Sequence, residues 1–239
     1  MDQRSINRYA FCPFTFGVEI RDAFFKVKRT KSSHAVCNSG FYTRTIIIMA
    51  ILERYLLYLK NESSEPSHAP VLLQDARRRM PTDTDIVIRD VRIARRFFEF
   101  DISVSQDRIM EEVIKILSTI AEFDSCEKVT EENWPKEEAI NKARELFNME
   151  RYWKTHEVLE QVWKKSEGSE KQILNGIILV AAALVHFQKA EYDTCVGILK
   201  RAYGKIETFS GNYHGINIDS LKLDIGKIID TGKIMTLTL

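Results

Sequence analysis

The stretch of this 239-residue chain with residues suited to chemistry is ERYWKTHEVLEQVWKKS, which runs from Glu150 to Ser166. It places His156, Glu157 and Glu160 within little more than one helical turn, and Trp163 follows about one turn later. An imidazole at position i and a carboxylate at i+4 share one face of a helix, where both can reach the same cation or bond to each other. The HExxH motif of zinc peptidases has a second histidine where Glu160 stands, so that chemistry is excluded.

The apolar residues around this motif predict which side of its helix faces the core. Tyr152, His156, Leu159, Glu160 and Trp163 fall on one stripe at helical spacing. We therefore expect His156 and Glu160 to be partly buried, and Glu157 to point away from the centre of the stripe. The favoured interpretation is a structural network, in which Glu160 accepts a hydrogen bond from the Trp163 indole or a neighbouring backbone N–H and orients His156.

A second interpretation adds residues of the following helix, where Asn175 and His186 share a face. His156, Glu160 and His186 would form the two-histidine, one-carboxylate set of a metal-dependent hydrolase. Antiparallel packing of the two helices, however, separates the two histidines by roughly 10 Å along the axes. A pocket for an organic ligand or a protein partner is the third interpretation. The chain is expected to bind no metal and no cofactor.

The motif and the helix after it resemble a known family. HEVLEQVW followed by LNGIILVAAALVHF is similar to domain-of-unknown-function family 309, and the resemblance covers about residues 138–205. It implies an all-α domain without an established activity, which in similar proteins follows an N-terminal addition. Leu179 and Ala190 depart from the polar residue and the glycine that the family tends to carry. The matching positions are His156, Glu157, Glu160, Trp163, Gly176 and His186.

A helical domain is predicted for residues 135–234, because a sequence repeat and helical periodicity run through it. Residues 146–163 align without gaps on residues 186–203, an offset of 40. Each copy has the pattern of a tetratricopeptide-like (TPR-like) helical hairpin, and two copies are too few for an extended array. We therefore expect a compact helical bundle. The predicted helices are 135–149, 151–165, 170–189, 191–208 and 218–230, with a loop at 210–217.

Residues 53–132 show the order β-α-β-β-α-β, which is typical of a ferredoxin-like α/β domain. The chain is thus predicted to be an α+β protein with this domain first and the helical bundle second. The ferredoxin-like fold hosts many functions, so it does not select one. The predicted strands are 54–60, 86–94, 95–104 and 124–132, and the predicted helices are 70–80 and 105–123.

Residues 1–48 show no sustained period of either strands or helices. Two interpretations stay open for this segment. It is either a poorly ordered N-terminal arm or the product of a gene start placed too early, with the working protein beginning near Met49.

The composition favours a cytoplasmic protein. Lys and Arg number 35 against 34 Asp and Glu, so no overall charge attracts nucleic acid or anionic membranes. The four cysteines have no CxxC spacing, which argues against disulfide frameworks and thiolate zinc sites. The longest apolar runs fall short of the roughly 18 residues of a membrane span. The oligomeric state is not predicted.

Nucleic-acid binding remains an alternative that is less favoured. Phe97, Phe98 and Phe100 lie on a predicted middle strand, where an RNA-recognition domain displays stacking aromatics. The competing interpretation places these rings in the core and the arginines in solvent. We therefore expect a non-enzymatic binding or interaction module, with a protein or small ligand as its partner. The arginines concerned are Arg77, Arg78, Arg79, Arg89, Arg92, Arg95 and Arg96.

Overall fold

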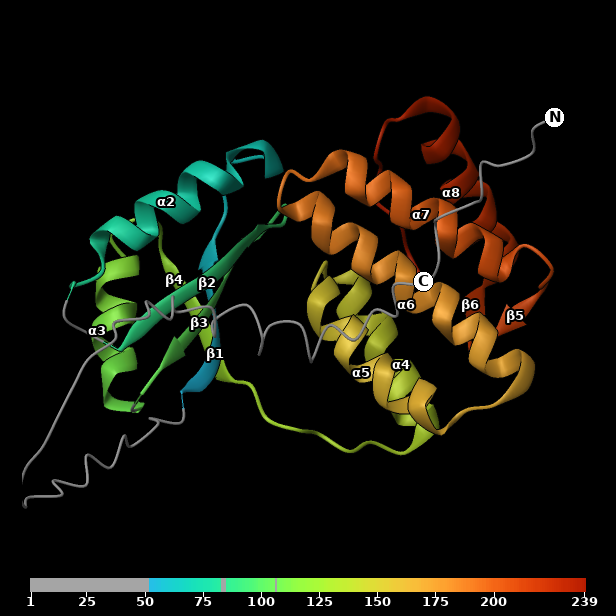
Figure 1. Cartoon of the computed structure of the whole chain (residues 1–239), viewed down its shortest axis with the longest axis horizontal. Coiled ribbons are helices and arrows are strands. Elements are labelled where there is room, and N and C mark those ends of the chain that lie inside the picture. The colour runs from blue at the N-terminus through green and yellow to red at the C-terminus, as the bar shows by residue number, and fades with distance from the viewer. Residues whose placement is uncertain (1–51, 83–84, 106) are drawn as a thin grey trace, which may run out of the picture. The chain divides into compact units, whose positions relative to one another are not determined.

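A computed structural model of the chain describes residues 52–82, 85–105 and 107–239. Both predictions for the N-terminal arm, residues 1–48, lie outside the described residues. Residues 49–239 belong to one compact unit. This unit has a mixed α/β part followed by a helical part (Figure 1).

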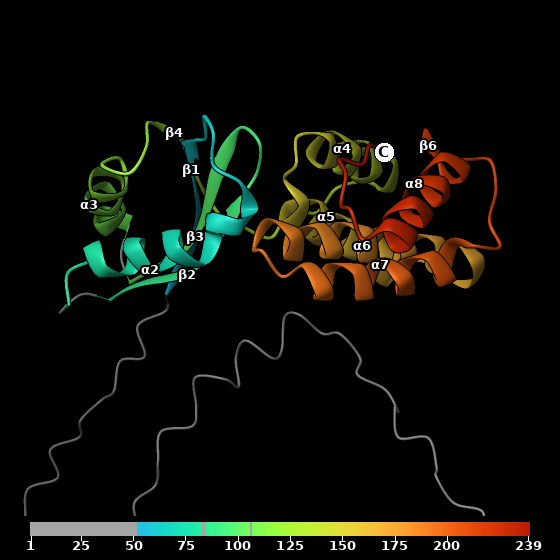
Figure 2. The ribbon, with the colours of Figure 1, turned by 90° about the horizontal axis from the view of Figure 1, so that it is seen from above.

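The α/β part is a four-stranded antiparallel sheet in the order β2-β3-β1-β4. Helices α2 and α3 cover one of its faces, as Figures 1 and 2 show from two directions. In chain order the elements are β1 (Glu53–Lys60), a 3-10 helix (Pro66–His68), α2 (Ala69–Arg79), β2 (Ile86–Ile93), β3 (Phe97–Val104), α3 (Asp107–Leu117) and β4 (Phe123–Lys128).

The two faces of the sheet differ because side chains alternate along each strand. Leu57 and Leu59 of β1 join Phe98 and Phe100 of β3 in the core beneath the helices. The phenylalanines of the middle strand are therefore core residues at two of the three predicted positions, and Phe97 packs its ring edge on Tyr58. The opposite face of the same strands carries charged side chains.

The helix predicted for residues 105–123 is shorter, because α3 ends at Leu117. The hydroxyl of Ser118 bonds to the carbonyl oxygen of Ile114, and that of Thr119 bonds to the carbonyl oxygen of Ile116. The backbone N–H of Ser118 still bonds to the carbonyl oxygen of Ile114, but those of Thr119 and Ile120 bond to carbonyls three residues back, the tighter pattern that closes a helix. The chain turns after them, and the last strand begins at Phe123 instead of residue 124.

The helical part has five helices in the described chain, in agreement with the predicted number. The segment 210–217, predicted as a loop, contains a small hairpin in which β5 (Asn212–Tyr213) pairs with β6 (Ile216–Asn217). The helices are α4 (Lys136–Asn148), α5 (Tyr152–Lys165), α6 (Gly168–Gln188), α7 (Tyr192–Ile206) and α8 (Ile218–Thr231).

The turns at the two repeated positions have the same backbone conformation. Glu150 and Ala190, which are 40 residues apart, have φ values of 63° and 65°. In each turn the following N–H bonds back to a helical carbonyl, from Arg151 to Leu146 and from Glu191 to His186, both at 2.9 Å. This pattern ends a helix with one left-handed residue. The sequence repeat is thus also a repeat of local structure.

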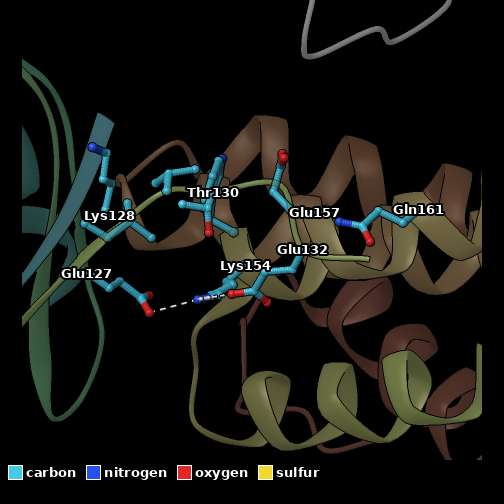
Figure 3. A pocket seen from close by; sticks show the side chains of 10 residues that line it. Glu127, Lys128, Thr130, Glu132, Lys154, Glu157 and Gln161 are labelled. Carbon is cyan, nitrogen blue, oxygen red and sulfur yellow. Dashed lines mark hydrogen bonds and ion pairs between the residues drawn. The ribbon is translucent and has the colours of Figure 1, made fainter. Parts of the chain in front are cut away.

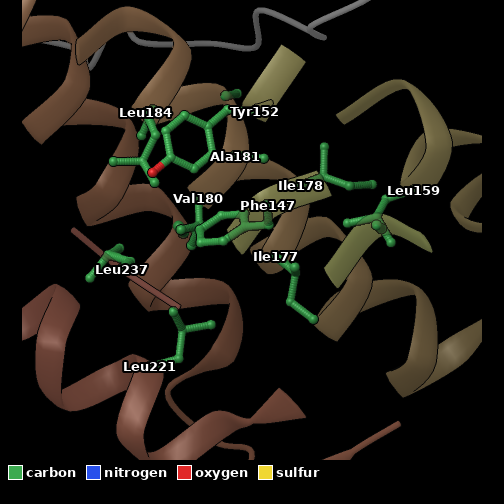
Figure 4. Packing of buried hydrophobic residues seen from close by; sticks show 14 of the residues in the cluster. Phe147, Tyr152, Leu159, Ile177, Ile178, Val180, Ala181, Leu184, Leu221 and Leu237 are labelled. Carbon is green, nitrogen blue, oxygen red and sulfur yellow. The ribbon is translucent and has the colours of Figure 1, made fainter. Parts of the chain in front are cut away.

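Helix α6 lies at the centre of the helical core, which Figure 4 shows around Phe147, Leu159 and Ile177. A Cβ atom added at Gly176 would collide with Ile206, so this glycine lets α6 and α7 approach closely. By length and composition α6 could also cross a membrane, but 61% of its apolar window is buried inside the protein. The central helix of a folded core can be equally long and apolar, so the burial of α6 explains its apolar composition.

Candidate functional site

Helix α5 carries the motif at the edge of its buried stripe. Its buried residues are Tyr152, Thr155, Val158, Leu159 and Val162, which pack into the helical core. The motif residues lie beside this stripe, so their side chains are anchored by the helix and still reach water. This placement agrees with the predicted partial burial of His156 and Glu160.

The structure brings His156, Glu157 and Glu160 together into one group. One donor atom from each side chain lies within 4.8 Å of the other two, a grouping that could hold a metal ion. The Nδ1 atom of His156 is 3.5 Å from a carboxylate oxygen of Glu157. The side chains of His156, Glu157 and Glu160 are 15%, 42% and 28% exposed, so the group opens to solvent. We call it the His156 trio.

Glu157 is the most exposed side chain of the trio, which agrees with its predicted place away from the centre of the buried stripe. One detail of the predicted network is wrong. Glu160 pairs with Lys164 at 3.3 Å instead of with Trp163, whose buried indole nitrogen has no hydrogen-bond partner among the described residues. The ring of Trp163 instead lies 4.7 Å from the ammonium of Lys171. Lys164 reaches Glu160 because residues four apart are neighbours on a helix.

The structure places the two predicted site residues of α6 outside the trio. His186 binds the carboxylate of Glu191 in the α6–α7 turn. Glu191 also pairs with Lys189 at 3.1 Å, and Lys189 pairs with Asp90 of β2 at 3.0 Å. Burial alone would raise the pKa of Glu191, but its bonds to His186 and Lys189 hold that pKa below its ordinary value. Asn175 is half-buried on α6.

A small cavity of about 50 Å³ adjoins the trio, and Glu157 is one of its lining residues (Figure 3). Trp153, Lys154 and Gln161 of α5 line it together with β4 and the segment after it. A cavity of this size holds about one or two water molecules or an ion. Glu157 therefore lies between the trio and a small, partly open hollow.

Glu127 of β4, beside this cavity, was not singled out by sequence reasoning. Its carboxylate accepts hydrogen bonds from Lys154 at 2.8 Å, Arg151 at 3.3 Å and the hydroxyl of Tyr58 at 3.1 Å. Burial alone would raise the pKa of Glu127, but these bonds and the charge of Arg151 lower it. Its partners are distant in sequence, so no local spacing could have identified the residue.

Most of the arginines proposed to face nucleic acid are bonded within the protein. Arg92 is 2% exposed and pairs with Glu99, while Arg95 binds Glu150. The buried guanidinium of Arg92 cannot reach a phosphate, whereas that of Arg95 is paired but 67% exposed. The other three with internal side-chain partners are Arg77 with backbone carbonyls of β2, Arg79 with Asp75 and Arg89 with Asp101.

Comparisons with known proteins match the helical part. Residues 140–203 match the model of a family described as Domain of unknown function (DUF309). An uncharacterized protein of Aquifex aeolicus (strain VF5) is 26% identical over 98 residues, which are 41% of this chain and 29% of that relative. The match thus spans less than a third of the relative. A conserved hypothetical protein from Thermus thermophilus, known from a crystal structure, is 28% identical with a TM-score of 0.34, over 38% of this chain and 95% of that chain.

The resemblance predicted from the motif is therefore confirmed for the helical part. The matched residues include His156, Glu157, Glu160, Trp163, Gly176 and His186. Residues 140–203 of this chain match the family Domain of unknown function (DUF309).

Proposed function

We propose that this protein is a non-enzymatic binding module that holds a divalent metal ion at the His156 trio. The observation that carries the proposal is the grouping of three donor atoms within 4.8 Å on one helix. An imidazole and two carboxylates are ligands of Zn²⁺, Mn²⁺ and Fe²⁺ in proteins. Three protein ligands leave coordination positions for water or for a group supplied by a partner.

The distances are compatible with this role. Ligands of a tetrahedral ion with bonds of about 2.1 Å lie roughly 3.4 Å apart. The His156–Glu157 separation of 3.5 Å already has this value. Glu160 needs a small side-chain movement away from Lys164, and a side chain that is 28% exposed has room for it.

The second copy of the repeat supports a functional origin of the trio. An offset of 40 residues places Val196, Gly197 and Lys200 where the first copy has His156, Glu157 and Glu160. The buried positions are apolar or small in both copies, with Leu159 matched by Leu199, for example. The hairpin therefore forms without a His-Glu-Glu group, which argues that the trio is present for binding instead of folding.

The metal-dependent hydrolase with His186 as a ligand has less support. His186 is bonded to Glu191. The third member of the group around His156 and Glu160 is Glu157, not His186. Nucleic-acid binding has less support for a comparable reason. The side chains of five of the seven arginines proposed for it are bonded to other groups of the protein. A protein partner or small ligand that completes the metal coordination is the partner we infer.

The architecture in this proposal is a ferredoxin-like domain followed by a bundle of TPR-like hairpins. The element order β-α-β-β-α-β and the strand order β2-β3-β1-β4 support the ferredoxin-like domain. The repeated turn at Glu150 and Ala190 supports the TPR-like hairpins. These features position α5 with one side in the core and the trio at the surface.

The test is calorimetric titration of the full chain with Zn²⁺ alone. Wild-type protein should bind one ion in a saturable manner, and its melting temperature should rise because the ion binds the folded state. His156→Ala and Glu160→Gln should each weaken this binding at least tenfold. Glu145→Gln, which changes a carboxylate on α4 that is 64% exposed and outside the trio, is the matched control.

The proposal fails if wild-type protein and His156→Ala bind Zn²⁺ with equal affinity. It also fails if neither shows saturable binding. Circular dichroism of each variant separates loss of the ion from loss of the fold.

A further inference from the structure

A larger cavity, of about 180 Å³, lies at a different place in the protein and takes no residue of the His156 trio. Its walls come from the end of β2, the α4–α5 turn, the end of α6 and residues 234–236 of the C-terminal segment. Tyr152, Leu184 and Phe187 form much of its apolar lining. A closed apolar cavity of about 150 Å³ is large enough to hold benzene. This volume therefore suits a small organic molecule.

Tyr152 places a hydroxyl group in this lining. The residue is only 4% exposed, and its hydroxyl has no hydrogen-bond partner in the part of the chain that the structure describes. Figure 4 shows the hydroxyl on the side of Leu184, which lines the same cavity. Burial, followed by the charge of Glu150, raises the pKa of Tyr152. The group is therefore protonated at neutral pH and can donate.

Gln188 supplies a second polar group. This residue is 2% exposed, and its Nε2 donates to the backbone carbonyl of Glu150 at 2.8 Å. That bond sets the orientation of the amide, because only the nitrogen can donate. Its Oε1 receives no hydrogen bond within residues 52–82, 85–105 and 107–239. This oxygen and the hydroxyl of Tyr152 are not among the fully buried unpaired atoms of the described residues, so both keep some access to solvent and a molecule in the cavity can reach them.

Two of the three charged residues that line the cavity, Arg95 and Glu150, are paired with each other, and the third is Glu65. The carboxylate of Glu150 accepts a hydrogen bond from the backbone N–H of Arg95 at 2.9 Å and another from its guanidinium. The pair leaves no unpaired cationic group in the lining, and the carboxylate of Glu65 repels anions. An anionic ligand would lose its hydration without gaining an opposite charge.

We propose that this cavity binds a small neutral molecule with an apolar body and one hydroxyl group. The hydroxyl would donate to Oε1 of Gln188 and accept from the hydroxyl of Tyr152, while the body contacts Leu184 and Phe187. This inference is independent of the metal proposal, since the two sites share no residue.

Phenol and benzene are the probes that test it, because they differ by a single hydroxyl. Titration followed by two-dimensional NMR should show saturable binding of phenol to the full chain with a dissociation constant of about 1 mM or lower. Benzene should bind more weakly. Tyr152→Phe should weaken phenol binding about tenfold, the usual effect of one lost hydrogen bond, and leave benzene binding unchanged.

Tyr192→Phe is the matched control. Tyr192 is the repeat equivalent of Tyr152, but it is 41% exposed and lies outside the cavity lining. Ala94→Leu, which adds volume at the cavity wall, should weaken binding of both probes. Equal phenol affinity in Tyr152→Phe and Tyr192→Phe would overturn the proposal, as would the absence of saturable phenol binding to the wild-type protein.

Discussion

Ala190 has a backbone conformation that costs free energy for any residue with a Cβ atom. Its φ of 65° lies in the left-handed region, where glycine is favoured. Ala190→Gly should therefore raise the free energy of unfolding by about 0.5–1 kcal/mol. Urea denaturation with an unchanged m-value measures this gain.

Glu150 is the comparison for this prediction, because it has a φ of 63° at the equivalent position. Glu150→Gly relieves the same backbone strain but removes the acceptor of the Arg95 N–H. Its free energy of unfolding should fall by about 1 kcal/mol, the lower end of the cost of an unpaired donor, because the N–H of Arg95 is only partly buried. A gain in both variants would show that the carboxylate contributes nothing, and a loss in both would contradict the strain at Ala190.

Glu160 should contribute little to the free energy of unfolding when no metal is bound. Its partner Lys164 lies one turn away and is 61% exposed, and such exposed pairs contribute about 0–1 kcal/mol. Glu160→Ala should thus change the free energy of unfolding by less than about 0.5 kcal/mol in metal-free buffer. Denaturation with a chelator present measures it. A loss of about 2 kcal/mol or more would support a structural network in place of a binding site.

Part of the site could be predicted from residue spacing alone. Helical periodicity identified His156 and Glu160 on one edge, because neighbours on the same helix follow from the sequence. The approach of the Glu157 carboxylate to His156 was not predicted, because backbone periodicity does not determine side-chain rotamers. Glu127 and Gln188 could not be found, since their partners are 24 or more residues away. Contacts of that kind depend on tertiary packing.

At the scale of elements, the polar face of the sheet carries a buried charge cluster. Asp101 of β3 is bonded to Arg54 and lies 3.6 Å from Arg92 and 3.8 Å from Arg89. Trp153 of α5 covers these groups, with its ring centroid 4.2 Å from the guanidinium of Arg54. Burial would raise the pKa of Asp101, but the bond to Arg54 and the neighbouring arginines hold it below its ordinary value.

This cluster predicts a loss of stability in acid. Because the pKa of Asp101 is lower in the folded state, its contribution is present above the unfolded-state pKa of about 4 and is lost as pH falls through the folded value. Asp101→Asn should lower the free energy of unfolding by about 3 kcal/mol at pH 7, because Arg54 loses its carboxylate partner and the buried Arg92 keeps only Glu99. The difference from wild type should shrink below about pH 4.

Asp75→Asn is the control for the acid prediction. Asp75 pairs with Arg79 one turn away on α2, and both side chains are about 40% exposed. This variant should differ from wild type by less than about 0.5 kcal/mol at either pH. Urea denaturation across the pH range measures both variants, and a pH-independent effect of Asp101→Asn would contradict the ion-pair account.

Most elements of the fold were predictable because their periodicity is strong. Strands β1, β2 and β3 and helices α4 to α8 begin and end within a few residues of the predicted limits. The end of α3 was missed, because the backbone bonds of Thr119 and Ile120 tighten to carbonyls three residues back although the apolar pattern continues. The β5–β6 hairpin was missed because strands of two residues have no detectable alternation.

At the scale of the whole described unit, three groups of ion pairs join the sheet to the helices. Glu127 of β4 binds Lys154 and Arg151 of α5. Arg95, which follows β2, binds Glu150, and Asp90 of β2 binds Lys189 at the end of α6. Burial would lower the pKa of Lys189, but the charge of Asp90 and a bond to it raise that pKa. These ion pairs are partly buried, so each contributes more to the free energy of unfolding than a fully exposed pair does.

The three groups together should make the sheet and the helices unfold in one transition. Calorimetry of the wild-type protein should give a calorimetric enthalpy equal to the van't Hoff enthalpy. The triple variant Asp90→Asn, Glu127→Gln, Glu150→Gln removes the three carboxylates while keeping their size, so it should separate the transition into two. The control converts Asp75, Glu145 and Asp224, whose pairs lie within single helices, to the corresponding amides. Two transitions in the wild-type protein, or one in both triple variants, would show that apolar contacts and not these ion pairs set the cooperativity.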